Sequence, residues 1–253
     1  MRRIRLVVAY DGTDYCGWQI QDNAVTVEGE LTKALRTWLR EDVEVIGASR
    51  TDSGVHALGN IAVFDTQSRI PAHKFAAGLN HYLPQDIRVQ RSEEVEADYH
   101  PRRRATEKTY EYTILNTRMD LPTCQRYAYH VYRPLDTGRM REAAAWLEGE
   151  HDFSAFCSAG SQVKSKVRTI YELAVREEPL PGCNGGRKIC LRVRGSGFLY
   201  NMVRIIAGTL IEVGEGRRTL DDVKEALSAG DRKKAGPTAP PQGLMLMEIR
   251  EKE

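Results

Sequence analysis

The sequence predicts an α+β protein made of two similar lobes, with antiparallel sheets joined into one extended sheet. Helices are expected to pack on one side of this sheet, and an active-site cleft is expected between the lobes. Three observations support this prediction: segments that alternate between apolar and polar residues, amphipathic helical segments between them, and a similar order of elements in both halves. The predicted lobes are residues 1–105 and residues 106–253.

The first half begins with an apolar, β-branched strand, residues 4–10, that ends at the turn residues Asp11-Gly12. Thr26 is predicted to be a helix N-cap, because apolar residues recur after it at helical spacing through Leu39. Pro71 is predicted to open a short helix. Three further strands are expected near residues 43–48, 60–65 and 87–94.

The second half begins with KTYEYTIL, residues 108–115, whose alternation is typical of a half-buried strand. Helices are predicted at 137–149 and 198–213, with strands near 169–176 and 188–194 between them. Thr219 is predicted to cap a small helix with Asp222 in the N3 position. A last strand is expected at 244–250.

The composition is that of an ordinary globular protein, with 253 residues, 41% apolar and 28% charged. No apolar run is long enough to cross a bilayer, and Met1-Arg2-Arg3 leads directly into a strand rather than a signal sequence. A cytoplasmic location is therefore expected. Five scattered cysteines, with no CxxC pair and no zinc-like spacing, predict reduced, mostly buried thiols and no metal.

The net charge is only +2, so local clusters of basic residues are more informative than the total. Such clusters on a nearly neutral chain can form a patch for a polyanion, or they can be solvated faces without a partner. Both interpretations are open for each cluster. The clusters are Arg2/Arg3/Arg5, Arg102-Arg103-Arg104 with Lys108, Lys164/Lys166/Arg168 and Arg232/Lys233/Lys234.

The segment GASRTDSGVHA, residues 47–57, is the richest in chemically useful side chains. It lies between two predicted strands, yet it is longer than a simple hairpin turn and holds Arg50 two residues from Asp52. Gly54 permits a sharp bend beside the carboxylate. Asp52 is therefore a candidate catalytic residue, and the alternative is an Asx-turn in which it only caps local amides.

Seven segments in order resemble motifs of the TruA family of tRNA pseudouridine synthases, and together they cover the chain from Tyr10 to Leu246. GASRTDSGVHA is similar to the family's catalytic loop, with a serine, Ser49, where glycine is usual. Pro101 and Arg103 are two further mild departures. The other six segments are YDGTDYCGWQIQ with Thr26-Val27, LNHYLPQDIRV, YHPRRRATEKTYEY, HDFSAFCS, GSGFLYNMVRIIAGTLIEVGEGR and TAPPQGLML.

The resemblance implies an isomerase that converts uridine to pseudouridine at positions 38, 39 and 40 in the anticodon stem-loop of tRNAs. By the same resemblance, Asp52 is the catalytic aspartate and Arg204 its cationic partner. Tyr110 packs against the flipped uracil, and Arg50 helps to displace the target base. The resemblance also implies a homodimer that binds tRNA.

The chemistry of the reaction agrees with these roles. The isomerisation needs no redox change and no group donor, so a nucleophilic or proton-abstracting carboxylate suffices and no cofactor is expected. Burial of a carboxylate raises its pKa, so a reactive aspartate in a dry pocket needs a cation beside it. Arg204 suits this role because its neighbours in sequence are apolar, and an unpaired arginine among them would be costly.

Two other functions are open at this point. A non-catalytic tRNA-binding or RNA-chaperone protein could use the same basic residues and would be indifferent to Asp52. A hydrolase built on Asp52 and His56 would leave Tyr110 and Arg204 without a role. His56 is expected to order the loop, and Cys157 is expected in the core. Trp18 is expected either to touch RNA or to shape the first loop.

Overall fold

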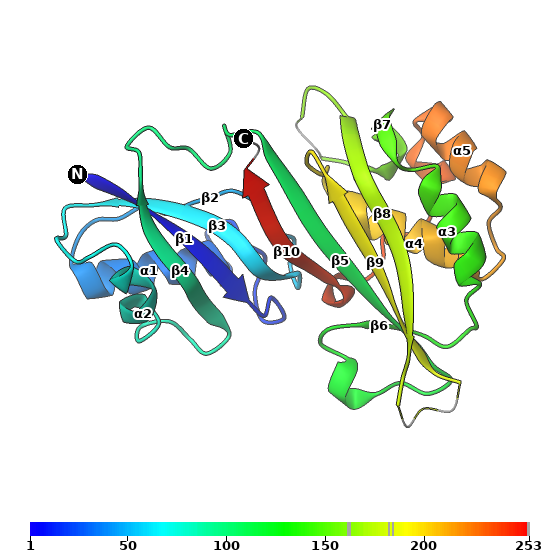
Figure 1. Ribbon diagram of the computed structural model, residues 1–253, viewed down its shortest axis with the longest axis horizontal. Helices are drawn as coiled ribbons and strands as arrows, with labels where there is room; N and C mark the ends of the chain where they lie inside the picture. The colour runs from blue at the N-terminus through cyan, green and yellow to red at the C-terminus, as the bar shows by residue number, and fades with distance from the viewer. Residues whose placement is uncertain (161–162, 182, 184, 252–253) are drawn as a thin grey trace. The chain divides into compact units, whose positions relative to one another are not determined.

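The computed structural model describes residues 1–160, 163–181, 183 and 185–251. These residues form a mixed fold with five α-helices and ten strands (Figure 1), which confirms the predicted α+β class. The chain divides into two compact units, the first made of Met1–Thr106 and Met245–Glu253 and the second of Glu107–Leu244. The predicted lobe 106–253 included the last strand, which groups instead with the first unit.

The sheet of the first unit has the strand order β4-β1-β3-β10, with β2 paired to β3. Strand β1 is antiparallel to both β3 and β4, whereas β10 is parallel to β3, with Met245 opposite His56. The sheet is therefore mixed rather than purely antiparallel. Its strands are β1 (Arg2–Tyr10), β2 (Ile46–Gly47), β3 (His56–Thr66), β4 (Ile87–Val95) and β10 (Leu244–Glu251).

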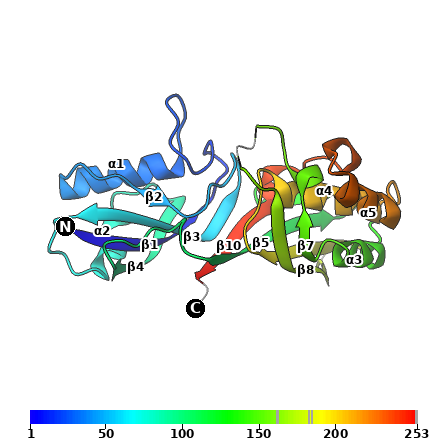
Figure 2. The same cartoon turned by 90° about the horizontal axis from the view of Figure 1, so that it is seen from above.

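Two helices cover one face of this sheet, α1 (Val27–Leu39) and α2 (Lys74–Leu79). Thr26 caps α1 as predicted, since its side chain accepts a hydrogen bond from the Gly29 amide at 3.3 Å. Phe75 of α2 packs edge-on against Trp38 of α1 and Phe64 of β3, with ring centroids 5.6 and 5.5 Å apart. Figure 2 shows α1 along this face. These aromatic contacts fix the helices on the sheet.

Each arginine of the basic cluster at the N-terminus is paired with a carboxylate. Arg2 forms an ion pair with Glu94, Arg3 with Asp65, and Arg5 with Glu93. These carboxylates lie on the neighbouring strands β3 and β4, so the arginines connect strands of the sheet. The cluster is therefore neutralised by structural ion pairs.

The sheet of the second unit has the strand order β5-β9-β8-β7, with antiparallel pairing throughout this series. A further short strand, β6, runs parallel to β5. The sequence did not predict β6 and β7, which have only three and four residues. The strands are β5 (Thr106–Asn116), β6 (Tyr129–Val131), β7 (Gly149–Asp152), β8 (Val167–Pro179) and β9 (Arg187–Gly195).

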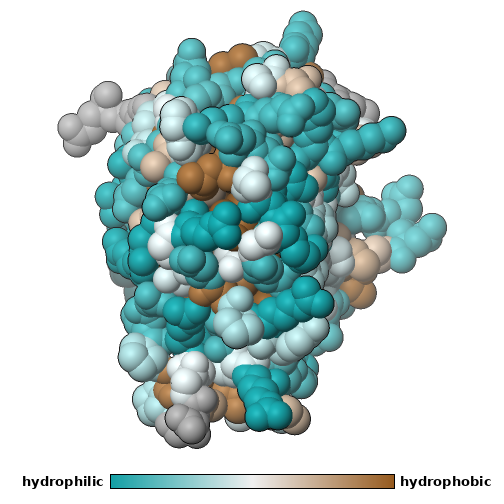
Figure 3. All heavy atoms as spheres, turned by 90° about the vertical axis from the view of Figure 1, so that its right-hand side faces the viewer, coloured by the Kyte–Doolittle hydropathy of each residue, from teal (hydrophilic) through white to brown (hydrophobic). Residues whose placement is uncertain are grey.

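The helices of the second unit are α3 (Thr137–Ala145), α4 (Met202–Gly214) and α5 (Leu220–Ala229). Helix α4 is almost entirely buried, which explains its nearly continuous apolar sequence. Helices α3 and α5 approach each other near the surface, where Lys224 lies 4.0 Å from the ring centroid of the half-exposed Trp146. The face of the molecule on the side of α3 and α5 is mainly hydrophilic (Figure 3).

The five cysteines are free thiols, but the prediction that most are buried is wrong. Cys157 is buried in the core, as predicted, and Cys16 is exposed. The other three are intermediate in exposure. Cys190 has its pKa raised to about 11, first by burial and then by the nearby negative charge of Glu111.

Candidate active site

The Asp52 loop, residues 48–55, connects β2 to β3 and is held by the loop that follows β1. The amide of Trp18 donates to the carbonyl oxygen of Thr51 at 3.1 Å. The carbonyl oxygen of Tyr15 accepts two hydrogen bonds at 3.2 Å, one from the amide of Gly54 and one from the hydroxyl of Ser53. The backbone on both sides of Asp52 is therefore fixed by neighbouring chain.

Glycines make this close approach possible. A Cβ atom at Gly12 would lie 2.0 Å from the carbonyl oxygen of Val55, and one at Gly17 would lie 2.6 Å from that of Thr51. Gly17 also has a φ of +87°, which L side chains rarely adopt. A side chain at either position would push the first loop away from the Asp52 loop.

Buried polar groups support the Asp52 loop from the sheet. The amide nitrogen Nδ2 of Asn60, on β3, donates to the carbonyl oxygen of Ser49 at 3.0 Å and to Oη of Tyr10 at 3.3 Å. The Tyr10 hydroxyl in turn lies 2.7 Å from Oγ1 of Thr51. All four residues are buried. The positions before Arg50 and before Asp52 are thus both anchored.

The local hydrogen bonds argue against the Asx-turn interpretation of Asp52. In such a turn the carboxylate accepts from the amide two residues further on, which is Gly54. That amide donates instead to Tyr15, and the next one, Val55, donates to the backbone carbonyl of Asp52 at 3.1 Å. Gly54 and Val55 thus each donate to a backbone carbonyl oxygen, and the Asp52 side chain is half-buried.

His56 and Trp18 have structural positions. The amide of Gly12 donates to Nδ1 of His56 at 3.0 Å, and Oδ1 of Asp11 lies 3.1 Å from the same nitrogen. His56 is 1% exposed, so it orders the loop, as expected, and is poorly placed for hydrolysis. Trp18 is fully buried and donates from Nε1 to Glu28 at 3.0 Å, so it shapes the first loop.

The predicted substrate-binding residue Tyr110 lies on β5 in the second unit. It is 7% exposed, and its ring packs edge-on against Phe198 with centroids 5.3 Å apart. Tyr112 lies on the same face of the strand and is fully buried, and its hydroxyl donates to the carbonyl oxygen of Pro240 at 2.8 Å. Burial raises the pKa of Tyr112, while the positive charge of Arg204 opposes this shift.

Arg204 is half-buried in the first turn of α4 and held from two sides. Its Nε donates to the carbonyl oxygen of Ala239, and its Nη1 donates to Oδ1 of Asn201, both at 2.8 Å. The segment around Ala239 comes very close to the helix, since a Cβ at Gly208 would lie 1.9 Å from the carbonyl oxygen of Pro237. Arg204 is therefore a positioned guanidinium rather than a solvated one.

The structure places Arg50 and Asp52 in one loop. It also places Arg204 within electrostatic reach of Tyr112, which is two residues from Tyr110 on β5. The ion pair between Asp52 and Arg204 stays a prediction. Sequence reasoning missed Asn60 and Tyr15, whose contacts with the Asp52 loop come from distant parts of the chain. It placed Arg102 in a basic cluster but gave it no partner.

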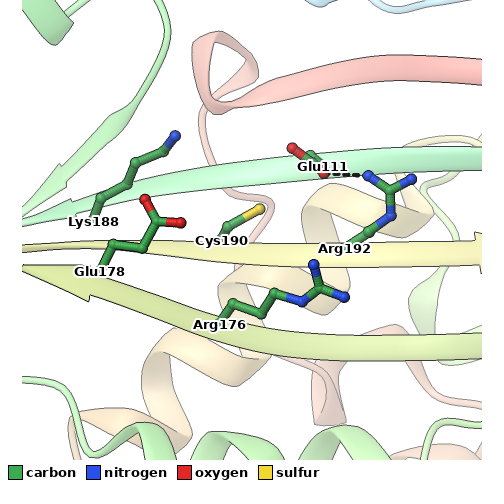
Figure 4. Close-up of a pocket in the computed structure, with 6 residues that line it drawn as sticks. All are labelled: Glu111, Arg176, Glu178, Lys188, Cys190 and Arg192. Atoms are coloured by element: carbon green, nitrogen blue, oxygen red, sulfur yellow. Dashed lines mark hydrogen bonds and ion pairs between the residues drawn. The ribbon is translucent and has the colours of Figure 1, made fainter.

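A pocket on the second unit contains none of the predicted site residues. It lies on one face of the sheet, where charged side chains of β5, β8 and β9 gather (Figure 4). Along each strand these side chains alternate with those on the opposite face. An ion pair between Glu111 and Arg192 crosses from β5 to β9. The lining residues are Glu111, Arg176, Glu178, Lys188, Cys190 and Arg192.

Over the part of the chain that the structure describes, no cluster of three or more His, Cys, Asp or Glu residues is arranged to hold a metal ion. Within the same residues, no helix has the length and apolar character required to span a bilayer.

The chain belongs to the tRNA pseudouridine synthase family, whose members are isomerases. The family model with this description matches residues 6–102 and 143–250. Over 249 residues, the chain is 48% identical to tRNA pseudouridine synthase A of Brevibacillus brevis and 47% identical to that of Thermoanaerobacter sp.. Each alignment covers 98% of this chain and 99% of the relative.

One solved structure, the crystal structure of the archaeal box H/ACA sRNP Nop10-Cbf5 complex, has a TM-score of 0.35 and 12% sequence identity. The match covers 92% of this chain and 60% of that chain. The family assignment therefore rests on the sequence matches and not on this structure.

Proposed function

We propose that this enzyme isomerises uridine to pseudouridine at positions 38, 39 and 40 in the anticodon stem-loop of tRNAs. The observation that carries the proposal is the Asp52 loop, in which a half-buried carboxylate is attached to a backbone fixed by Trp18 and Tyr15. A catalytic group is effective when its backbone holds it in a fixed geometry relative to the reacting atoms of the substrate. Membership of the tRNA pseudouridine synthase family supplies the reaction class.

In this proposal Asp52 is the essential nucleophile or base. The glycosidic bond of the uridine must break, the uracil must turn over, and its C5 must bond to C1′ of the ribose. These events rearrange one nucleotide without a redox change or a group donor, so the carboxylate needs no cofactor. The half-buried position of Asp52 supports this role, because a flipped base can exclude the remaining water.

Arg204 is proposed to pair with Asp52 and keep it ionised. A guanidinium stays charged when water is excluded, and it can bind a carboxylate through two nitrogens. Its contacts with Ala239 and Asn201 use Nε and Nη1, so the orientation of the planar group is set before substrate binds. This orientation supports the assignment.

Tyr110 and Arg50 are proposed to bind the substrate. The Tyr110 ring offers a stacking surface for the uracil, and such stacking is worth about 1–3 kcal/mol per base. Arg50 is exposed and lies two residues from Asp52, so it can fill the space that a displaced base leaves in the RNA stem.

The enzyme is further proposed to act as a homodimer in the cytoplasm, with each tRNA contacting both subunits. The family resemblance supports the dimer. A tRNA substrate supports the location, because tRNA is modified and used there.

The experiment follows tritium release from C5-labelled uridine in unmodified tRNA. Asp52→Asn is expected to reduce release to background while tRNA binding persists, because the amide cannot act as a nucleophile or base. Asp14→Asn is a matched control, since Asp14 is an exposed carboxylate in the neighbouring loop and should leave turnover unchanged. Full turnover by Asp52→Asn would rule out the mechanism. Binding of tRNA without tritium release by the wild-type protein would instead favour a non-catalytic tRNA-binding or RNA-chaperone protein.

A further inference from the structure

Arg102 is anchored beside the Asp52 loop in the first unit. It lies in the connection from β4 to β5, where its backbone amide donates to Nδ1 of His100 at 3.2 Å. Its Nε donates to the carbonyl oxygen of Gly47, the last residue of β2, at 2.6 Å. A Cβ at Gly47 would lie 2.2 Å from Nε1 of the buried Trp18, so this carbonyl has a fixed position. The stem of Arg102 is therefore held in place.

The charged ends of Arg102 and Arg50 have no carboxylate partner within the described part of the chain. The Arg50 side chain and the terminal nitrogens of Arg102 form neither a hydrogen bond nor an ion pair there. Arg104, two residues from Arg102, pairs with Glu96 at 2.8 Å. Both Arg50 and Arg102 are exposed, so an external group can reach them.

The surroundings of Arg102 favour an added negative charge. Its pKa is lowered, first by partial burial and then by the positive charge of Arg50, so the two guanidinium groups repel each other. The carboxylate that opposes this effect, Glu28, already accepts hydrogen bonds from Nε1 of Trp18 and the amide of Ile20. An anion between the arginines would relieve the repulsion.

We propose that Arg50 and Arg102 form a binding site for a phosphodiester group of RNA, next to the nucleotide that turns toward Asp52. The planar guanidinium matches the oxygens of a phosphate and forms charge-assisted hydrogen bonds with them. This ligand assignment rests on the proposed function, which supplies RNA as the substrate. The same site would hold the backbone of the flipped nucleotide from the side opposite its base.

The two arginines have different tasks in this site. Arg102 is the fixed member, because its Nε is anchored on Gly47. Arg50 has no such anchor, so it can contact the phosphate first and then move into the space of the displaced base. A fixed and a movable cation together hold the backbone while the base leaves the stem.

The test measures the affinity of an unmodified anticodon stem-loop RNA over a KCl series, with all substitutions made in an Asp52→Asn background to prevent turnover. Arg102→Gln is expected to weaken binding about tenfold, because it removes charge-assisted hydrogen bonds. It should also reduce the slope of log affinity against log salt by about 0.7–0.9, the value for one phosphate contact.

Two further variants separate charge from structure. Arg102→Lys should keep the wild-type salt slope, because the charge remains, but lose several-fold in affinity. Arg103→Gln is the matched control, since Arg103 is an exposed arginine of the same turn, and it should keep both affinity and slope. A purely structural role for Arg102 predicts instead the same change of slope for the Gln and Lys variants.

The proposal is overturned if Arg102→Gln keeps the wild-type slope, if Arg103→Gln lowers the slope equally, or if the stem-loop does not bind. Failure of the proposed function gives a different pattern. In that case the wild-type protein would release no tritium from labelled tRNA, while the slopes of the Arg102 and Arg103 variants would still differ as expected.

Discussion

Asn60 supports the Asp52 loop from a buried position on β3. Its side-chain amide bonds to the Ser49 carbonyl and the Tyr10 hydroxyl, and it is completely buried on β3. These bonds fix the chain before Arg50 and, through Tyr10, the side chain of Thr51. Asn60 is therefore a positioning residue for the predicted catalytic aspartate.

Replacing Asn60 with alanine should lower both stability and turnover. The buried Ser49 carbonyl would lose its donor, and an unsatisfied buried group costs about 1–3 kcal/mol. Because Asp52 would be less well placed, kcat should fall more than KM rises. Urea unfolding and steady-state tritium release measure the two effects.

Asn80→Ala provides the comparison for Asn60→Ala. Asn80 also bonds to backbone through its side-chain amide, accepting from the Val89 amide at 2.8 Å and donating to the Val89 carbonyl at 2.9 Å. It joins α2 to β4 rather than supporting the Asp52 loop. The expected result is a loss of stability with kcat unchanged, and an equal fall in kcat for both variants would contradict the role of Asn60.

At the residue scale, the sequence identified groups that share one short segment but not those that support them. Arg50 and Asp52 could be found because they lie two residues apart between strands. Tyr15, Asn60 and Arg102 could not, because their contacts with the loop or with Gly47 just before it depend on how β1, β3 and the β4–β5 connection fold together. The role of Trp18 could not be predicted for the same reason. Only its burial in the structure shows that it shapes the first loop instead of contacting RNA.

The first turn of α5 shows how a helix end is built from two side chains. Thr219 accepts from the amide of Asp222 at 3.2 Å, and the Asp222 carboxylate accepts from the amide of Thr219 at 2.7 Å. These two bonds satisfy amides that a helix start otherwise leaves without partners. The hydrogen bond from the Thr219 amide to the carboxylate, followed by the nearby Thr219 hydroxyl, lowers the pKa of Asp222 below its usual range.

Asp222→Asn should therefore destabilise the protein in a pH-dependent manner. A lowered pKa in the folded state means that the carboxylate adds stability above the ordinary aspartate pKa, near 4, and loses it as pH falls through the folded value. The difference in thermal unfolding midpoint between wild type and variant should be present at neutral pH and shrink in acid.

Asp221→Asn is the control for the pH profile. Asp221 is exposed in the same turn and feels the same helix dipole, but its carboxylate pairs with Lys224 instead of capping an amide. At neutral pH, Asp221→Asn should lower the thermal unfolding midpoint less than Asp222→Asn does. Equal changes for the two variants would show that charge alone, rather than the capping bond, stabilises the helix end.

At the element scale, helices with a strong start signal were the easiest to predict. Thr26 and Thr219 both cap the helices assigned to them. The predicted start of α4 at residue 198 was too early, because Asn201 adopts a left-handed conformation with φ of 60° just before the helix. Strands β6 and β7 were missed because three or four residues give no readable period.

The proposed homodimer is a prediction about the whole molecule. Light scattering coupled to gel filtration should give twice the chain mass of 28.6 kDa, with no dependence on RNA. A single species at the chain mass, over the concentrations used for activity, would contradict the dimer. Activity at that mass would also show that one subunit suffices for the reaction.

The sequence predicted the α+β class from periodicity, but it could not assign the last strand to its unit. The predicted boundary near residue 105 lies beside the observed division after Thr106. The composition of residues 244–250 indicates a strand and says nothing about its partner. Pairing with β3 is decided by tertiary contacts between residues almost 190 positions apart.

This long-range pairing has a consequence for the growing polypeptide. Strand β3 emerges from the ribosome about 180 residues before β10, so at roughly 5–20 residues per second its edge waits about 10–40 s for its neighbour. That edge begins at His56, directly after the Asp52 loop, and an open strand edge invites wrong pairing between nascent chains. The synthesis of β10 thus decides when the exposed edge of β3 becomes protected from wrong pairing.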